Sequence, residues 1–227
     1  MLNPWPGLPL AEPFVLKEDE RIIHLFNANL RERYREDQHI HLEVFPEPFS
    51  GNPHANIVLL NLNPGYYPRN KEFGGGTADF LRMWRANLAH EPQEYPFYHL
   101  HPKLKGSPGE VYYRQKFKAP VHEFGAKRVA EEFFVVEYFP YTTKRGVGNL
   151  SCIPSQEYGF HLVREAMRRN AVIIQLRSKQ RWQEMIPALK TYPRYYELRS
   201  VQNTAITEKN CPDGYPLIRK VLLGKSL

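Results

Sequence analysis

The amino-acid sequence predicts an α/β fold built on a mostly parallel sheet. Four short apolar runs alternate along the chain with longer segments whose apolar residues recur at helical spacing, a pattern typical of parallel strands joined by helices. The clearest runs, "IVLLNL" and "FFVVEYF", are apolar at consecutive positions, as expected for strands buried on both faces. Because 227 residues suit one domain, we predict a single domain over residues 1–227.

The amino-terminal quarter contains few strand signals. Residues 1–16 are rich in proline and are expected to lie on the surface as an extended arm. A helix is predicted over 18–37, where Ile22, Ile23, Leu25, Phe26 and Leu30 recur at roughly helical spacing. The segment 46–54, "PEPFSGNPH", contains three prolines and a glycine and is predicted to be a loop.

Strands and helices then alternate to the end of the chain. The predicted strands are 56–62, 133–139, 171–176 and 194–201. The predicted helices are 78–90 with Thr77 as cap, 121–130, 155–169, 178–189 with Ser178 as cap, and 215–223. Between them, residues 91–120 are predicted to be an irregular insertion, either a binding loop or a segment packed on the surface.

The charge is unevenly distributed along the sequence. Residues 161–227 contain 13 Lys and Arg against 5 Asp and Glu, a net charge of +8, whereas residues 1–160 have a net charge of −1. A basic carboxyl-terminal third fits a polyanion such as nucleic acid, and it also fits a solvated basic surface. The lysine and arginine content therefore leaves both interpretations open.

Several classes of protein are disfavoured. No apolar run is long enough to cross a bilayer, and the first residues lack the basic region of a signal peptide, so we expect a cytoplasmic protein. We also expect a monomer. Cys152 and Cys211 form neither a disulfide framework nor a zinc spacing. The pairs His39/His41 and His99/His101 have no further ligand at useful spacing. We expect no metal and no cofactor.

Each predicted strand is followed by residues suited to contacting a ligand. The four strand exits are "NLNPGYYP" (61–68), "EYFPYTTKR" (137–145), "LRSKQ" (176–180) and "SVQNTAIT" (200–207). Ligands of open α/β sheets bind beyond the carboxyl ends of the strands. The four exits are therefore expected to surround one site, with Arg177 and Lys179 facing a phosphate backbone.

The first exit, Asn61-Leu62-Asn63-Pro64-Gly65, together with the order of the other exits, resembles the uracil-DNA glycosylase superfamily. It is most similar to the mismatch-specific Asn-Pro-Gly branch, except that Asn61 replaces the first glycine of the motif. This resemblance implies a three-layer α/β/α sandwich with a central four-stranded parallel sheet. It also implies hydrolysis of the N-glycosidic bond of a base flipped out of DNA, without a metal.

The resemblance assigns roles in the first exit. Asn63 corresponds to the residue that orients the attacking water; the alternative is an Asx turn that starts the loop. Gly65 lets the backbone approach a ligand closely. Tyr66 or Tyr67 corresponds to a tyrosine that excludes 5-methylated bases, and Phe73 is placed to stack on a base. The alternative for these three aromatic residues is packing within the loop or the core.

The second exit departs from the family pattern. Glu137 falls where the uracil-specific branch has an asparagine that reads the base. An ionised glutamate only accepts hydrogen bonds and is expected to favour an exocyclic amine over the uracil carbonyl. The alternative is a structural carboxylate paired with an arginine or a backbone donor. Tyr141 is a candidate base or phosphate contact, and Lys144 and Arg145 are candidate phosphate clamps.

The fourth exit lacks the family's His-Pro-Ser. In its place are Gln202, Asn203 and Thr204. Gln202 or Asn203 is expected to donate to the leaving base, and Thr204 to hold a phosphate. The leading functional hypothesis is a DNA glycosylase that acts on a flipped, damaged base. The alternative is a catalytically silent module that binds a nucleobase or nucleic acid on the same fold.

Overall fold

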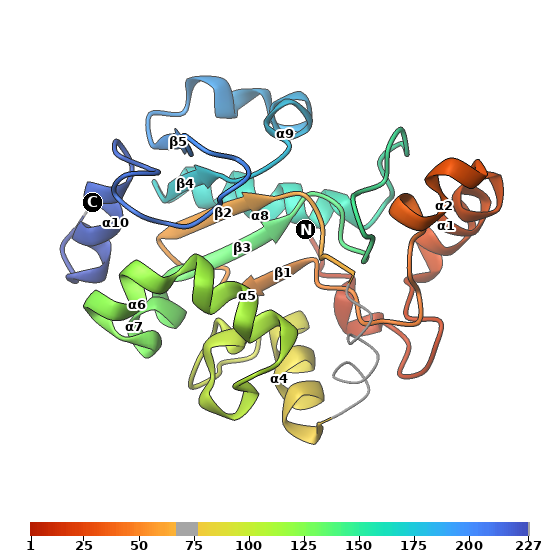
Figure 1. The fold of residues 1–227 in the computed structure, drawn as a ribbon, viewed down its shortest axis with the longest axis horizontal. Coiled ribbons are helices and arrows are strands. Elements are labelled where there is room, and N and C mark those ends of the chain that lie inside the picture. The colour runs from red at the N-terminus through yellow and green to blue at the C-terminus, as the bar shows by residue number, and fades with distance from the viewer. Residues whose placement is uncertain (67–76, 227) are drawn as a thin grey trace.

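A five-stranded mixed sheet forms the centre of the molecule. The computed structural model describes residues 1–66 and 77–226. The sheet has the strand order β1-β3-β2-β4-β5, in which β1 runs antiparallel to β3 and every other pair is parallel (Figure 1). The strands are β1 (Phe49–Gly51), β2 (Ile57–Asn61), β3 (Phe133–Glu137), β4 (Val172–Gln175) and β5 (Tyr195–Glu197).

This sheet confirms the α/β class and differs from the sequence prediction at one edge. All four predicted strands are present, each shorter than predicted. The prediction of a loop over 46–54 is wrong, because it contains β1, which adds an antiparallel fifth strand to the four parallel ones. Three residues flanked by prolines carry no alternating pattern, so only pairing with β3 makes this segment a strand.

Asn87 completes the hydrogen bonding of the edge strand β1. Its Nδ2 donates to Phe49 O at 2.9 Å, and its Oδ1 accepts from Gly51 N at 3.0 Å. A side-chain amide thus takes the place of a sixth strand and protects the edge from pairing with another chain. Gly51 has φ +110°, and a Cβ built there would lie 2.4 Å from Phe133 O, so this position requires glycine.

The helices follow the predicted order with several changes of boundary. The predicted helix over 18–37 is two helices, because Leu30 and Arg31 are extended. The prediction over 121–130 is likewise divided at Gly125. The α-helices are α1 (Lys17–Asn29), α2 (Glu32–Gln38), α4 (Ala78–Leu88), α5 (Pro108–Lys116), α6 (Lys118–Phe124), α7 (Ala126–Glu132), α8 (Gln156–Arg168), α9 (Lys179–Met185) and α10 (Tyr215–Leu222). None of the helices in the described residues has the length and apolar character needed to cross a bilayer.

The two predicted helix caps have different outcomes. The Thr77 side chain accepts from Phe80 N at 3.1 Å, which confirms it as the cap of α4. Ser178 occupies the cap position of α9 with φ 61°, but its side chain makes no capping hydrogen bond, so that prediction is wrong. The left-handed backbone at Ser178 turns the chain directly from the end of β4 into the helix.

The prediction of an irregular insertion over 91–120 is wrong in its second half. Residues 108–116 form α5, and the Ser107 side chain caps the helix by accepting from Glu110 N. The signal was present in the sequence, because Ser-Pro-x-Glu combines a capping residue, a proline in the first turn and an acidic residue three positions after the cap. Two short 3₁₀ turns, η2 (Tyr98–Leu100) and η3 (Pro102–Leu104), precede α5.

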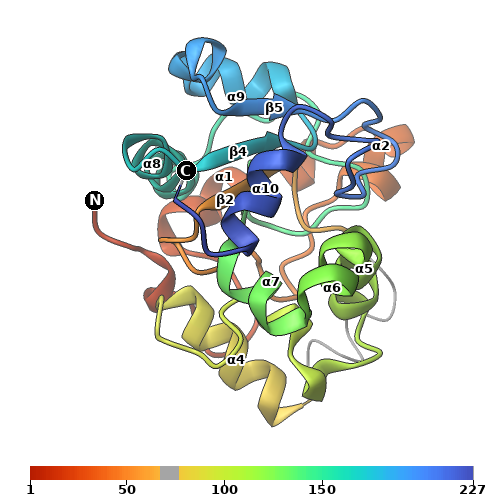
Figure 2. The same cartoon turned by 90° about the vertical axis from the view of Figure 1, so that its left-hand side faces the viewer.

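Alternate residues of the central strands enter two separate hydrophobic clusters. Val58 and Leu60 of β2 pack in a cluster with residues of α1, α4, α8 and α9, whereas Ile57 and Leu59 pack in a cluster with residues of α5, α7 and α10. Figure 2 shows α8 and α10 on opposite sides of the strands. This division fixes the side of the sheet toward which each residue at a strand end points.

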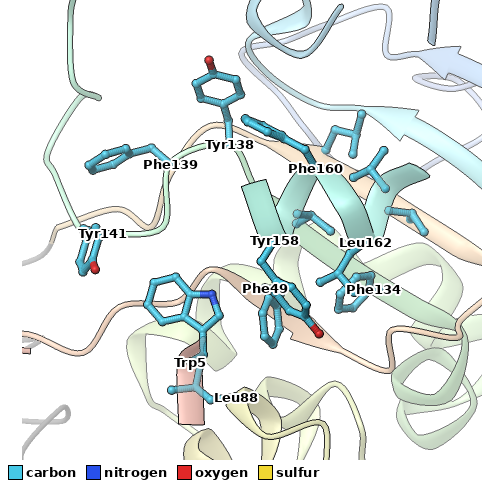
Figure 3. Close-up of a cluster of buried hydrophobic side chains, with 14 of the residues drawn as sticks. Trp5, Phe49, Leu88, Phe134, Tyr138, Phe139, Tyr141, Tyr158, Phe160 and Leu162 are labelled. Carbon is cyan, nitrogen blue, oxygen red and sulfur yellow. The ribbon is translucent and has the colours of Figure 1, made fainter. Parts of the chain in front are cut away.

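The amino-terminal residues reach the first of these clusters. Trp5, in the 3₁₀ turn η1 (Trp5–Gly7), is 1% exposed. Its ring centroid lies 5.8 Å from that of Tyr141, and Figure 3 shows it near Leu88 and Phe49. The stretch predicted as a surface arm therefore contributes a large side chain to the core.

Candidate functional site

A cavity of about 540 Å³ lies at the carboxyl ends of the central strands, a size typical of small-ligand pockets. The first strand exit lines it with residues Asn61 to Gly65, the second with Glu137, Thr142, Lys144 and Arg145, and the third with Arg177. Helix α5 and the turns before it add Tyr112, Tyr113 and His99, and the segment before β1 adds Val44, Phe45 and Glu47. Three of the four predicted exits thus meet at one cavity.

The polar end of the cavity is formed by Asn61 and Glu137. These residues are paired in the register of β2 and β3, and both continue the strand face that packs against α5 and α7. Asn61 Nδ2 donates to Glu137 Oε1 at 2.9 Å. Asn61 is 5% exposed and Glu137 is 6% exposed, yet Asn61 Oδ1 and Glu137 Oε2 have no hydrogen-bond partner in the described structure.

Burial dominates the protonation of Glu137. It raises the pKa of this carboxyl from 4.5 to about 8; the nearby Glu47 raises it further, whereas the hydrogen bond from Asn61 and the charges of Lys116 and Arg177 lower it. The sequence suggested an ionised acceptor or a structural carboxylate paired with an arginine or a backbone donor. Among the described residues, Asn61 is the one that hydrogen-bonds this carboxyl. With a pKa of about 8, the protonated carboxyl is favoured at neutral pH.

Asn63 lies on the cavity wall with its amide held in one orientation. Its Nδ2 donates to Pro64 O at 2.7 Å, Thr143 O at 3.2 Å and Thr143 Oγ1 at 2.9 Å. Carbonyl oxygens only accept, so the amide nitrogen must face them and Oδ1 must face elsewhere. The contacts to Thr143 connect the first strand exit to the second.

The residues that follow Asn63 divide between the wall and its surroundings. Gly65 lines the cavity and forms an isolated bridge with Thr143. Tyr66 stacks on His41, with ring centroids 3.7 Å apart and planes 8° apart, outside the cavity lining. Tyr67 and Phe73, predicted to exclude a methyl group and to stack on a base, lie outside the described residues.

Three predicted cations reach the cavity and one does not. Lys144 and Arg145 line it, and they form ion pairs with Glu36 and Asp37 of α2. Arg177 lines it as well, is exposed, and has no carboxylate within ion-pair distance among the described residues. Lys179 lies outside the lining and pairs with Glu197 at 2.7 Å. Arg177 is therefore the best placed cation for an anionic group of a ligand.

The fourth strand exit turns away from the cavity. Gln202 and Asn203 are exposed and do not line it. Asn203 is held in a local turn, since its O accepts from Asn210 Nδ2 at 2.7 Å. Thr204 is buried, and its hydroxyl accepts a hydrogen bond from Lys116 Nζ. The structure does not bring these predicted base and phosphate contacts to the site.

Tyr141 lies in the core. It is fully buried, its hydroxyl donates to Asp19 Oδ2 at 2.7 Å, and the same hydroxyl accepts from Leu16 N at 3.1 Å. Figure 3 shows the ring beside Phe139. These contacts attach the start of α1 to the loop after β3, which is a structural role and not contact with a ligand in the cavity.

Two groups near the site were not found from the sequence. Glu47 accepts hydrogen bonds from His99 Nε2 at 2.7 Å and from the Tyr98 hydroxyl at 3.2 Å. The antiparallel pairing of β1 brings Glu47 to the strand ends, where its N–H donates to Pro140 O. Short-range sequence patterns do not predict this contact, because it joins distant parts of the chain. A Cβ at Gly109 would lie 2.3 Å from His99 Nδ1, so the start of α5 packs directly on the imidazole.

The second of these groups is Lys116 on α5. It is 4% exposed, and burial lowers the pKa of its amine from 10.5 to about 7, an effect that the charge of Glu137 partly opposes. Its ammonium lies 4.6 Å from the ring centroid of Tyr112. In the described part of the chain, no three His, Cys, Asp or Glu side chains gather as metal ligands.

Comparisons with known proteins add no relative: no family model, no curated protein and no solved structure matches this chain.

Proposed function

We propose that this chain is a DNA glycosylase that binds a flipped base in the cavity and hydrolyses its N-glycosidic bond. The fold would be the three-layer α/β/α sandwich of the uracil-DNA glycosylase superfamily, extended by the antiparallel strand β1. The observation that carries the proposal is the fixed amide of Asn63 on the cavity wall. Asn63 lies two residues after Asn61, which pairs with the buried Glu137.

The role of Asn63 follows from the orientation of its amide. Thr143 and Pro64 accept from Nδ2, so Oδ1 is available to accept from a water molecule. A water held in this way is directed at the anomeric carbon while the sugar develops positive charge. An amide is a weak base, so we expect slow turnover and activity on bases that leave easily.

The rest of the cavity fits a base attached to a phosphate backbone. Its volume of about 540 Å³ is ample for a nucleobase and its sugar. Phe45, Phe80 and Tyr112 supply aromatic surface along its wall, which suits a flipped base. Arg177, which has no carboxylate partner among residues 1–66 and 77–226, provides a positive charge for a phosphate. The net charge of +7 favours a polyanion.

The test is base release from defined oligonucleotides. Wild-type protein in excess is incubated with strands that contain one uracil, hypoxanthine or xanthine, and abasic sites are then cleaved with alkali. We expect cleavage of at least one strand, with a rate about 10²-fold lower for Asn63→Ala and unchanged for Asn29→Ala on the exposed face of α1. Absence of cleavage on every strand would refute the glycosylase proposal.

One observation favours a second candidate, a binding module without catalysis. Gln202 and Asn203 lie outside the cavity, so the fourth exit supplies no donor for the leaving base, and loss of one such donor typically costs about 10²- to 10³-fold in rate. Titration of the same oligonucleotides at increasing salt distinguishes the candidates. Salt-sensitive binding without base release supports the module.

A further inference from the structure

The Asn61–Glu137 pair carries an inference about how a base is selected, and this inference rests on the proposed use of the cavity for a nucleobase. Two buried oxygens on residues that line the cavity, Asn61 Oδ1 and Glu137 Oε2, have no hydrogen-bond partner in the described structure. Buried polar atoms are nearly always hydrogen-bonded. Two such atoms on neighbouring residues of one cavity wall therefore point to a ligand that reaches them when it enters the cavity and completes their hydrogen bonds.

The orientation of both groups is defined by their mutual hydrogen bond. Because Asn61 Nδ2 donates to Glu137 Oε1 at 2.9 Å, Asn61 Oδ1 is an obligatory acceptor. Glu137 Oε2 donates if the carboxyl is protonated and accepts if it is ionised. Which ligand groups the pair can hydrogen-bond therefore depends on whether Glu137 is protonated.

The surroundings of Glu137 favour the protonated form. It is 6% exposed and forms no ion pair among the described residues, and an isolated buried carboxylate is costly. The groups that act on it are Glu47 before β1, Tyr113 and Lys116 on α5, and Arg177 after β4. Lys116, whose charge acts on this carboxyl from α5, donates through Nζ to Thr204 Oγ1. Burial raises the pKa of the carboxyl to about 8.

We propose that Glu137 acts as an uncharged hydrogen-bond donor beside the acceptor Asn61, so that the pair binds a nucleobase edge that carries an acceptor next to an N–H donor. The uracil edge, with O4 beside N3–H, has this arrangement. Glu137 then takes the part of an amide, so its carboxyl group does not exclude carbonyl-bearing bases. Ionisation of Glu137 would place two acceptors in the pair and weaken binding of the same edge.

The experiment measures the contribution of the base to binding. The probes are short single-stranded oligonucleotides with one uracil on a 2′-fluorinated sugar, which resists cleavage, and the same strands with an abasic analogue. The ratio of the two dissociation constants isolates the base from the phosphate contacts. It is measured from about pH 6.5 to about pH 9 for the wild type and for Glu137→Gln, whose amide keeps a donor beside an acceptor at every pH.

We expect the base contribution of the wild type to fall about tenfold over this range, as one group with a pKa near 8 ionises. For Glu137→Gln we expect the base contribution to fall only by the amount that the titration of uracil itself causes. Parallel pH profiles for the two proteins would overturn the inference, as would the absence of any base contribution in the wild type. Abolition of the base contribution by Glu137→Gln in a protein with a normal melting curve would do the same.

A second variant tests the acceptor. Replacing uracil by 3-methyluracil removes the N–H, and we expect at least tenfold weaker base-dependent binding by the wild type. Asn61→Ala lacks the acceptor and should bind the two bases equally, and a tenfold preference for uracil in this variant would overturn the role of Asn61. Cleavage of unfluorinated strands is scored separately. Cleavage together with parallel pH profiles overturns the role of Glu137 and leaves the glycosylase proposal standing. The expected pH profiles without cleavage support the role of Glu137 and overturn the glycosylase proposal.

Discussion

Replacing Glu137 by glutamine should change how the stability of the protein depends on pH. The pKa of this carboxyl is about 8 in the folded protein against 4.5 ordinarily. Between these values the unfolded chain has lost its proton and the folded protein keeps it, so the contribution of Glu137 to stability is full below about pH 4.5 and is lost as pH rises toward 8. From about pH 5 to about pH 8 this amounts to about 3–4 kcal/mol. Glutamine cannot ionise and keeps the hydrogen bond from Asn61.

The assay is urea denaturation of both proteins at several pH values between about 5 and 8. We expect the free energy of unfolding of Glu137→Gln to exceed that of the wild type by an amount that grows with pH, because only the wild type has a carboxyl that ionises at this position. Subtracting the two free energies at each pH cancels most contributions of the groups that both proteins share. Glu91→Gln, an exposed change after α4, serves as a control and should leave the dependence of stability on pH close to that of the wild type. Parallel pH curves for wild type and Glu137→Gln would refute the protonated carboxyl.

Three further predictions concern the frame of the site. Lys116→Met should remove a rise of stability with pH. The pKa of Lys116 is lowered to about 7, so the free energy of unfolding of the wild type should rise relative to that of the variant by about 3–4 kcal/mol between about pH 7 and pH 10. Equal dependence on pH in urea denaturation of the two proteins would contradict this. Gly51→Ala should cost more than about 2 kcal/mol, because its Cβ would clash with the β3 backbone, whereas Gly7→Ala, with open space around it, should cost little in the same assay. Gly109→Ala should displace His99 and lower the melting temperature by several degrees; a melting curve matching that of Gly7→Ala would show that α5 does not press on the imidazole.

The central strands could be predicted because their signal is local. Ile57 to Leu60 and Phe133 to Val136 are apolar at every position, which few structures other than a strand covered on both faces accommodate. Strand β1 could not be found in this way. Its conformation depends on pairing with β3 and on the amide of Asn87, contacts that join distant parts of the chain.

The candidate site shows the same contrast. Asn61 and Glu137 each end a recognisable strand, so their meeting at one cavity follows from the parallel register. The prediction that the fourth exit contacts the ligand was wrong, because Asn210 holds the residues after β5 in a local turn. Residue types alone do not reveal this contact. Helix α5 covers the site and carried a capping signal at Ser107, but the surrounding prolines and aromatic residues obscured it.

The most direct test of the account is a crystal structure of the protein bound to the fluorinated uracil oligonucleotide. We predict that the uracil lies in the cavity, with its O4 and N3–H within hydrogen-bond distance of Glu137 Oε2 and Asn61 Oδ1, and that the anomeric carbon faces Asn63. Oligonucleotide bound elsewhere on the surface, or a base in the cavity with no contact to Asn61 and Glu137, would contradict it.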